Sequence, residues 1–310
     1  MEASAVDVTG WEERAHDPAL EGRRSKRWLH NPEEPPRTRA WLFKELRVIE
    51  DGHAHDEWTE PIIAALGQAL GVPCAEVRWA QWNGVRGSIS RSVVSQPGWE
   101  MISGIAWMDR RLGRSVLDAA PDRRTASDLY TIEAIRHTLA DVCPPVPAGA
   151  GGAGLAAFDV FVGYLILDAL SSCPDRHGEN WAVLVDSHGE RARLAAAFDF
   201  EGRLGTELSG EDRDRLLSVS GALDEYRSSH RPWFFSWGDA EVPTLIQKAR
   251  RAWGLCGSAS RMHWQSALAG VRDEHVRDLI DPAPGVERDE RRLVTEIVLA
   301  NLRDLCVALR

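Results

Sequence analysis

The feature that most constrains the fold is a charged loop enclosed by two apolar segments. The loop, residues 173–180, reads Cys-Pro-Asp-Arg-His-Gly-Glu-Asn, and it lies between an apolar run at 158–170 and a shorter one at 181–185. Both flanking segments should be buried, the first as a helix and the second as a strand. Asp159 and Asp168 interrupt the longer run, which favours a core helix over a membrane span. The chain must therefore hold a polar loop at the edge of its core.

Three oxygen-bearing side chains can meet at this loop. Asp175 and Asn180 are five residues apart, and Asp199 follows Asn180 by 19 residues, which is enough for a hairpin to return the chain. Two carboxylates and one amide oxygen provide hard ligands that suit Mg²⁺ together with a phosphate, and one carboxylate remains to accept a proton. A single aspartate or asparagine in a loop more often only shapes a turn. The three together at this spacing favour the functional interpretation.

Charge and cysteine content narrow the class of protein. The net charge of −10 on 310 residues argues against a general nucleic-acid binder, which needs a basic surface. The five cysteines form no CxxC pair and no disulfide framework, so we expect a reducing, cytoplasmic compartment. The N-terminus lacks the pattern of a signal peptide. We expect a soluble protein with no direct nucleic-acid partner and no membrane segment.

The N-terminal third predicts a small sheet with one helix. Short strands are expected at 41–44, 75–80 and 87–94, and the Asn-Gly pair at 83–84 is a strong signal for a hairpin between the last two. Apolar residues at three- and four-residue spacing predict a helix at 57–70. The result is a compact antiparallel unit of the α+β class.

Several residues of this unit could serve a phosphate. Gly22, Ser25 and Lys26 belong to a Gly-Arg-Arg-Ser-Lys turn whose backbone N–H groups could face phosphate oxygens, although a solvated loop explains the turn as well. Lys44 ends a strand, and Glu60 lies in the first turn of the predicted helix, where the helix dipole favours a carboxylate. Both positions are ordinary on a protein surface. If they pair, however, the glutamate would hold the lysine toward a phosphate.

The remainder of the chain is mostly helical. The composition changes near residues 95–105, so we divide the chain into an N-lobe, residues 1–100, and a C-lobe, residues 101–310. Apolar periodicity predicts C-lobe helices at 131–142, 155–171, 241–253, 259–270 and 290–309, and a short helix is expected at 212–217.

The order Lys, Glu, Asp, Asn, Asp across a small sheet lobe and a helical lobe resembles the two-lobed protein-kinase-like fold. Residues 175–181, Asp-Arg-His-Gly-Glu-Asn-Trp, resemble the Asp-x-His-x-x-Asn catalytic loop of the bacterial HipA family of serine/threonine kinases. Phe198-Asp199 resembles the metal-binding aspartate motif of that family. The resemblance covers most of residues 20–310 and is greatest to the shorter members, which lack an extra N-terminal subdomain. It implies a small antiparallel N-lobe with one helix and a larger helical C-lobe.

The resemblance also assigns roles in the C-lobe. Asp175 would be the general base or would orient the substrate hydroxyl. Asn180 and Asp199 would bind Mg²⁺. His177 belongs to the same catalytic loop, and we expect it to act as a scaffold there. For Arg176 we leave two positions open, one facing a phosphorylated substrate and one facing solvent.

In the N-lobe, Lys44 would contact the phosphates of ATP with Glu60 fixing it, and Gly22, Ser25 and Lys26 would cover the outer phosphates. The implied activity is ATP- and Mg-dependent transfer of the γ-phosphate to a Ser/Thr hydroxyl of a protein substrate. The family also implies the toxin of a toxin–antitoxin pair, with a small DNA-binding antitoxin as partner.

Two other functions remain open. Aminoglycoside phosphotransferases and phosphoinositide kinases use related loops, so the chain could be a small-molecule or lipid kinase. Glu201 and Arg203 stand near Asp199, where small polar residues are expected. This departure leaves room for a pseudokinase that binds nucleotide without turnover.

Overall fold

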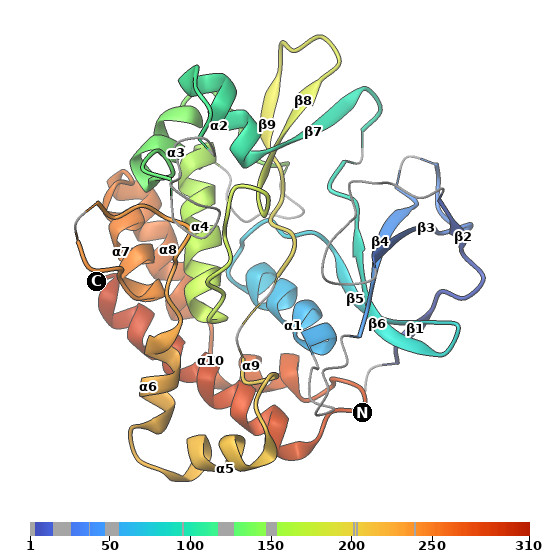
Figure 1. Ribbon diagram of the computed structural model, residues 1–310, viewed down its shortest axis with the longest axis vertical. Helices are drawn as coiled ribbons and strands as arrows, with labels where there is room; N and C mark the ends of the chain where they lie inside the picture. Colours follow the sequence, from blue (N-terminus) through green and yellow to red (C-terminus); the bar gives the residue numbers. More distant parts are fainter. Residues whose placement is uncertain are drawn as a thin grey trace.

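The computed structural model describes most of the chain, namely residues 4–14, 26–36, 38–46, 56–94, 96–116, 127–146, 154–200, 202, 204–238 and 240–310. Gly22, Ser25, Glu201 and Arg203 lie outside the described residues. The strands are β1 (Val6–Asp7), β2 (Glu12–Glu13), β3 (Lys26–His30), β4 (Ala40–Glu45), β5 (Val77–Trp82), β6 (Val85–Arg91), β7 (Trp99–Ser103), β8 (Ala182–Asp186) and β9 (Ala192–Leu194). The helices are α1 (Asp56–Ala69), α2 (Gly104–Leu112), α3 (Ile132–Thr138), α4 (Ala157–Leu170), α5 (Gly210–Ser218), α6 (Ala222–Ser229), α7 (Leu245–Gly254), α8 (Ser258–Gly270), α9 (Asp273–Ile280) and α10 (Arg288–Ala308). Figure 1 shows the larger sheet on one side, most helices on the other, and α1 between them.

The larger sheet has the order β1-β5-β6-β4-β3-β2, and every neighbouring pair is antiparallel except β1 with β5. Asn83 and Gly84 join β5 to β6 with φ angles of 50° and 79°. A type I′ turn needs positive φ at both central residues, so the predicted hairpin is confirmed. The parallel β1–β5 pair is an exception to the antiparallel sheet expected from the sequence.

This sheet must curl. The edge strands β1 and β2 are separated along the chain by only five Cα steps, from Asp7 to Glu12, which span at most about 18 Å. A flat sheet would place its first and sixth strands about 24 Å apart. The sheet therefore forms a half-barrel, and one of its faces carries a small core of its own. The buried members of this core are Val8, Leu29, Trp41, Phe43, Ala80 and Ile89.

The opposite face of the sheet carries a polar row. Lys26 pairs with Lys44 across β3 and β4, Lys44 pairs with Ser88 across β4 and β6, and Ser88 pairs with Trp79 of β5. Residues that pair directly project from the same face. Helix α1 packs against β5 and β6, and the Trp79 Nε1 donates to the backbone oxygen of Trp58 on α1 at 3.0 Å. The polar row therefore lies on the same side of the sheet as α1.

The core of the C-lobe is built around α4, whose residues are all buried except Asp159. Helices α7 and α10 pack against it, and the Trp264 Nε1 of α8 donates to the Asp159 backbone oxygen at 3.0 Å. Gly163 is required at this contact, since a Cβ there would lie 2.4 Å from the Trp264 ring. Three strands, β7-β8-β9, form a second antiparallel sheet beside this core (Figure 1).

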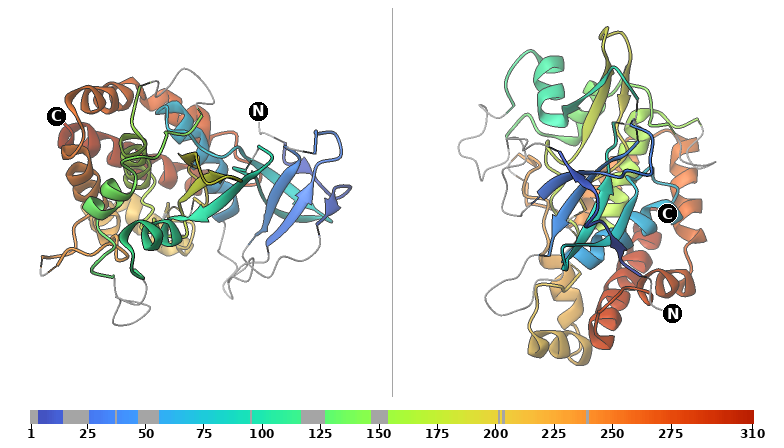
Figure 2. Two further views of the ribbon diagram at one scale, coloured as in Figure 1. Left: turned by 90° about the horizontal axis from the view of Figure 1, so that it is seen from above. Right: turned by 90° about the vertical axis from the view of Figure 1, so that its right-hand side faces the viewer.

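Helix α1 belongs to the core of the C-lobe as well as to the N-lobe. Ile62, Ile63 and Leu66 of α1 lie in the same buried cluster as the apolar residues of α4. The segment after α1 also reaches across, because Cys74 forms a parallel bridge with Ala197, just before Asp199. The view from above shows α1 against the helical lobe (Figure 2). The position of α1 is therefore fixed by both lobes.

The α+β class and most predicted elements are confirmed, but some elements were missed. Residues 26–30 form β3, so Lys26 begins a strand and does not lie in the predicted loop. Its neighbours along the chain are polar and give a weak strand signal, and pairing with β4 decides the structure. The structure also contains elements that were not predicted, among them helices α2, α6 and α9 and strand β7. Within the described part of the chain, no helix is long and apolar enough to cross a bilayer.

Candidate active site

The charged loop at 173–180 connects α4 to β8 and is held by a buried arginine. The Arg176 Nη2 lies 2.7 Å from the Asp168 Oδ1 on α4, and both side chains are about 1% exposed. The Arg176 Nη1 donates to the backbone oxygens of Asn180 at 2.6 Å and Phe198 at 3.3 Å. Arg176 therefore faces neither a substrate nor solvent. It ties the loop to the chain that leads to Asp199.

A second cation lies beside this pair. The Lys248 Nζ of α7 is fully buried and lies 3.5 Å from the Asp168 Oδ2, and it lies 4.9 Å from the centre of the Phe235 ring. Burial lowers the pKa of Lys248, and the nearby Asp168 carboxylate offsets this only in part. For Arg176, Asp168 outweighs the effect of burial and the pKa is raised. We call Asp168, Arg176 and Lys248 the arginine cluster.

Hydrogen bonds from three other elements fix the loop. The Tyr130 hydroxyl donates to the Arg176 backbone oxygen at 3.0 Å and accepts from the Trp181 Nε1 at 2.9 Å. The Asn301 Nδ2 of α10 donates to the Ser172 Oγ at 2.9 Å. The Gly104 N donates to the Trp181 backbone oxygen at 2.8 Å, and a Cβ on Gly104 would lie 2.0 Å from the Trp181 ring. The loop is thus held in one conformation by the surrounding C-lobe.

The predicted loop residues lie together. The Asn180 Nδ2 donates to the Asp175 backbone oxygen at 2.7 Å and to the Asp175 Oδ2 at 3.3 Å. The His177 Nε2 lies 3.8 Å from the same Oδ2, while the His177 Nδ1 accepts from the Glu179 N at 3.1 Å. The ring of His177 packs on that of Phe234 with centres 5.0 Å apart. Through these contacts His177 packs against its own loop and Phe234, and its role as a scaffold stays a prediction.

Asp199 follows β9 and has a backbone φ of 56°, a left-handed value that is uncommon outside glycine. Its Oδ1 lies 2.5 Å from the Lys44 Nζ, and its Oδ2 lies 3.7 Å from the Lys26 Nζ. Such backbone strain is often retained at functional sites. The conformation points this carboxylate at the polar row of the N-lobe sheet.

Lys44 is shared between two carboxylates. Its Nζ also lies 2.6 Å from the Glu60 Oε1 on α1, and the Ser88 Oγ donates to the other Glu60 oxygen at 2.6 Å. Burial alone would lower the pKa of Lys44, but Glu60 and Asp199 outweigh it and raise the pKa. We call Lys26, Lys44, Glu60 and Asp199 the lysine cluster. Its inner members are buried, whereas the side chains of Lys26 and Asp199 are each 20% exposed.

The structure therefore brings together the site residues that it describes. Lys26, Lys44 and Glu60 meet Asp199, and the contacts of Arg176 place Asp199 beside the loop that carries Asp175, His177 and Asn180. This list covers every predicted site residue except Gly22 and Ser25, which lie outside the described residues.

The sequence assigned no role at the site to Asp168, Lys248 or Ser88. Asp168 offered a signal, because an ionisable residue in a helix that is otherwise apolar needs a partner. Lys248 and Ser88 lie in segments of ordinary polarity, and nothing in their local sequence distinguishes them.

This chain is similar to known proteins in its fold and not in its sequence. No protein-family model matches the chain, and no curated protein matches its sequence. Among solved structures, the proinflammatory kinase CtkA of Helicobacter pylori matches with a TM-score of 0.72 and 12% identity, over 99% of this chain and 96% of that chain. HipA of Shewanella oneidensis MR-1, solved with HipB and operator DNA, matches with a TM-score of 0.54 and 13% identity, over 94% of this chain and 64% of that chain. The resemblance to HipA-like kinases is thus confirmed at the level of the fold: this chain has the two-lobed, kinase-like α+β fold of CtkA and HipA.

Proposed function

We propose that the chain is an ATP- and Mg-dependent kinase that phosphorylates a Ser/Thr hydroxyl of a protein. The observation that carries this proposal is the position of the Lys44 Nζ, 2.6 Å from Glu60 and 2.5 Å from Asp199. Glu60 is 16 residues from Lys44 and Asp199 is 155 residues from it. A lysine, a helix glutamate and a metal-binding aspartate brought together across two lobes are the parts that phosphoryl transfer uses.

The donor set fits a magnesium–nucleotide complex. Asp199 and Asn180 offer a carboxylate and an amide oxygen, and Mg²⁺ in such sites is bound by few protein ligands plus phosphate and water. Among the described residues, no group of three or more His, Cys, Asp or Glu could hold a metal unaided. The exposed edge of the cluster, Lys26 and Asp199, is where phosphates would enter.

Each residue then has a chemical role. Bound Mg²⁺–ATP supplies the phosphoryl group and a cation that neutralises developing charge. Lys44 and Lys26 orient the phosphates, and Glu60 keeps Lys44 extended toward them. Asp175 accepts the proton of the acceptor hydroxyl, whose oxygen becomes the nucleophile. The amide nitrogen of Asn180 holds Asp175 in place, which leaves its amide oxygen for the metal.

The test is transfer of labelled phosphate. The wild type is incubated with γ-labelled ATP and Mg²⁺, alone and with cell lysate, beside Asp175→Asn and Asp199→Asn. The matched control is Asp141→Asn, which changes a carboxylate that is 79% exposed in a surface ion pair with Arg111. We expect label on protein with the wild type and the control but not with the site variants. Label only on small molecules would indicate a small-molecule or lipid kinase, and nucleotide binding without transfer would indicate a pseudokinase.

A cellular role and a partner can also be proposed. The neighbour HipA belongs to a toxin–antitoxin system and was solved with HipB and DNA. By analogy, we propose that this chain acts as a toxin restrained by a small DNA-binding antitoxin. The free thiols of all five cysteines fit a cytoplasmic site of action. Growth arrest on expression of the wild type, absent with Asp199→Asn and relieved by a co-expressed neighbouring gene product, tests this role.

A further inference from the structure

The loop between α6 and α7, residues 230–244, exposes two aromatic side chains beside the catalytic loop. Trp233 is 60% exposed and Phe234 is 40% exposed. The ring of Phe234 lies 5.0 Å from that of His177, whose Nε2 lies 3.8 Å from the Asp175 carboxylate. Phe234 is therefore separated from the proposed general base by a single side chain, and Trp233 precedes it in the chain.

The exposure of this pair is imposed by the fold. The next residue, Phe235, is 1% exposed and packs on Tyr130 with ring centres 4.9 Å apart. The Ser236 N donates to the Tyr130 backbone oxygen at 2.9 Å, and Pro232 before the pair is buried. Because the loop is anchored on both sides of the pair, the side chains of Trp233 and Phe234 stay exposed to solvent. Contiguous exposed apolar side chains mark interaction sites more often than single ones do, and tryptophan is enriched among residues that dominate binding.

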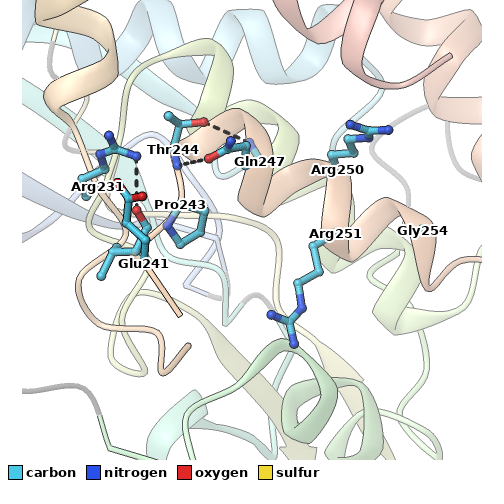
Figure 3. Close-up of a pocket in the computed structure, with 9 residues that line it drawn as sticks. Arg231, Glu241, Pro243, Thr244, Gln247, Arg250, Arg251 and Gly254 are labelled. Carbon is cyan, nitrogen blue, oxygen red and sulfur yellow. Dashed lines mark hydrogen bonds between the residues drawn. The ribbon is translucent and has the colours of Figure 1, made fainter. Parts of the chain in front are cut away.

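A basic pocket of about 690 Å³ lies where this loop meets α7. Arg231 and Glu241 line it from the loop, and Arg250 and Arg251 line it from α7 (Figure 3). Arg251 is already paired with Glu133 of α3 at 2.9 Å. The Arg231 Nη1 donates to the Val242 backbone oxygen at 3.2 Å, which leaves the other N–H groups of its guanidinium for a ligand. Arg231 and Arg250 therefore provide the cationic groups, against Glu241 as the one carboxylate among the described lining residues.

The charge of this pocket differs from that of the whole molecule. The chain carries a net charge of −10, so the average field repels acidic molecules, and only a local arrangement of arginines can attract them. Arginine binds carboxylates through paired hydrogen bonds. Arg231 precedes Phe234 by three residues, so the pocket begins within about 10 Å of the aromatic pair.

We propose that Trp233, Phe234, Arg231 and Arg250 form a docking surface for the acceptor protein. The occupant is an acidic segment of that protein, with an apolar side chain next to the acceptor hydroxyl and Asp or Glu about three or more positions away. The aromatic pair receives the apolar side chain while Arg231 and Arg250 receive the carboxylates. This inference rests on the proposed kinase function, since it names the class of substrate segment for the same site.

The test measures binding of defined peptides and does not require turnover. The probes are fluorescent twelve-residue peptides that contain one serine and one leucine, flanked by Glu in one peptide, by Gln in a second and by Lys in a third. Fluorescence anisotropy of the full-length wild type gives Kd at two salt concentrations. We expect the Glu peptide to bind at least about tenfold more tightly than the Lys peptide, with the difference shrinking as salt rises.

Variants with matched controls assign the binding to the surface. Arg231→Glu with Arg250→Glu should weaken the Glu peptide about tenfold or more, whereas Arg303→Glu, which reverses an exposed arginine on α10, should not. Trp233→Ser should weaken all three peptides, and the control is Met262→Ser on α8, because Met262 is also 60% exposed. Thermal unfolding of each variant checks that it folds.

The outcomes separate this inference from the proposed function. Selective binding of the Glu peptide that is lost in the Arg231/Arg250 variant supports the docking surface. Equal binding of all peptides, no binding, or an equal effect of Arg303→Glu overturns it. Failure of the kinase function would appear elsewhere, as absence of phosphate transfer from ATP to any acceptor while peptide binding persists.

Discussion

The lysine cluster and the arginine cluster both hold charged side chains from distant segments together, and they differ in exposure. In the arginine cluster, Asp168, Arg176 and Lys248 are all at most 1% exposed. In the lysine cluster, Lys44 is buried but Asp199 is 20% exposed. A ligand from solvent can reach Asp199 and replace its ion-pair partners, whereas Asp168 is closed to solvent. The same ionic chemistry therefore serves as scaffold in one place and as candidate site in the other.

The largest expected effect is loss of activity in the lysine cluster. Asp199→Asn removes a proposed metal ligand, so phosphate transfer should fall by on the order of a hundredfold or more. Its free energy of unfolding should change by only about 1 kcal/mol or less, because the carboxylate is partly exposed to solvent. Labelled-ATP assays and urea denaturation measure the two quantities. A variant that loses stability and activity together would remove the distinction between the clusters.

Breaking the arginine cluster should act on stability first. Arg176→Met leaves Asp168 buried with only Lys248 near it and frees the backbone oxygens of Asn180 and Phe198. Removing one partner of a buried ion pair costs about 3–5 kcal/mol. We expect a loss of that size in urea denaturation, followed by loss of activity because the loop is no longer held. A loss below about 1 kcal/mol would contradict the scaffold role.

Burial of Lys248 should make the free energy of unfolding depend on pH. Its folded-state pKa lies below the ordinary value of 10.5, so between those two values the unfolded chain binds more protons and stability rises with pH. The groups that face it are Asp168 of α4 and Arg176 and Cys173 of the loop. Lys248→Met should remove this rise.

The measurement for Lys248 is the difference in unfolding free energy between wild type and Lys248→Met across pH 6 to 10. Taking the difference removes the contribution of the buried thiols that do not face Lys248, since both proteins contain them. A pH-independent difference would show that Lys248 stays charged in the fold.

The smallest expected effect is at an exposed ion pair. Arg111 and Asp141 lie 2.7 Å apart at 39% and 79% side-chain exposure. Exposed pairs contribute about 0–1 kcal/mol and are screened by salt. A double-mutant cycle with Arg111→Gln and Asp141→Asn should give a coupling within that range, falling at higher salt. A coupling as large as that of the arginine cluster would show that burial does not govern the difference.

Local sequence patterns determined a substantial part of this protein. The Asn-Gly turn, the helix near Glu60, the apolar helix of α4 and the loop with Asp175 and Asn180 were all predicted, since each depends on spacing between near neighbours. The kinase-like fold was expected because the order of these parts resembles that fold, and comparison with CtkA and HipA confirmed it. That Lys44 pairs with Glu60 was an expectation that the distance of 2.6 Å now bears out.

Only the tertiary structure decided what each charged residue does. The sequence could not place Lys26 on a strand, because pairing with β4 fixes that segment. It left Arg176 between substrate and solvent, whereas packing of α4 and α7 buries it against Asp168. Nor could it show that Phe234 packs on His177 of the charged loop. The burial of a charged side chain and the identity of its partners are set by segments far apart along the chain. The free energy of the charge depends on these surroundings more than on its neighbours in sequence.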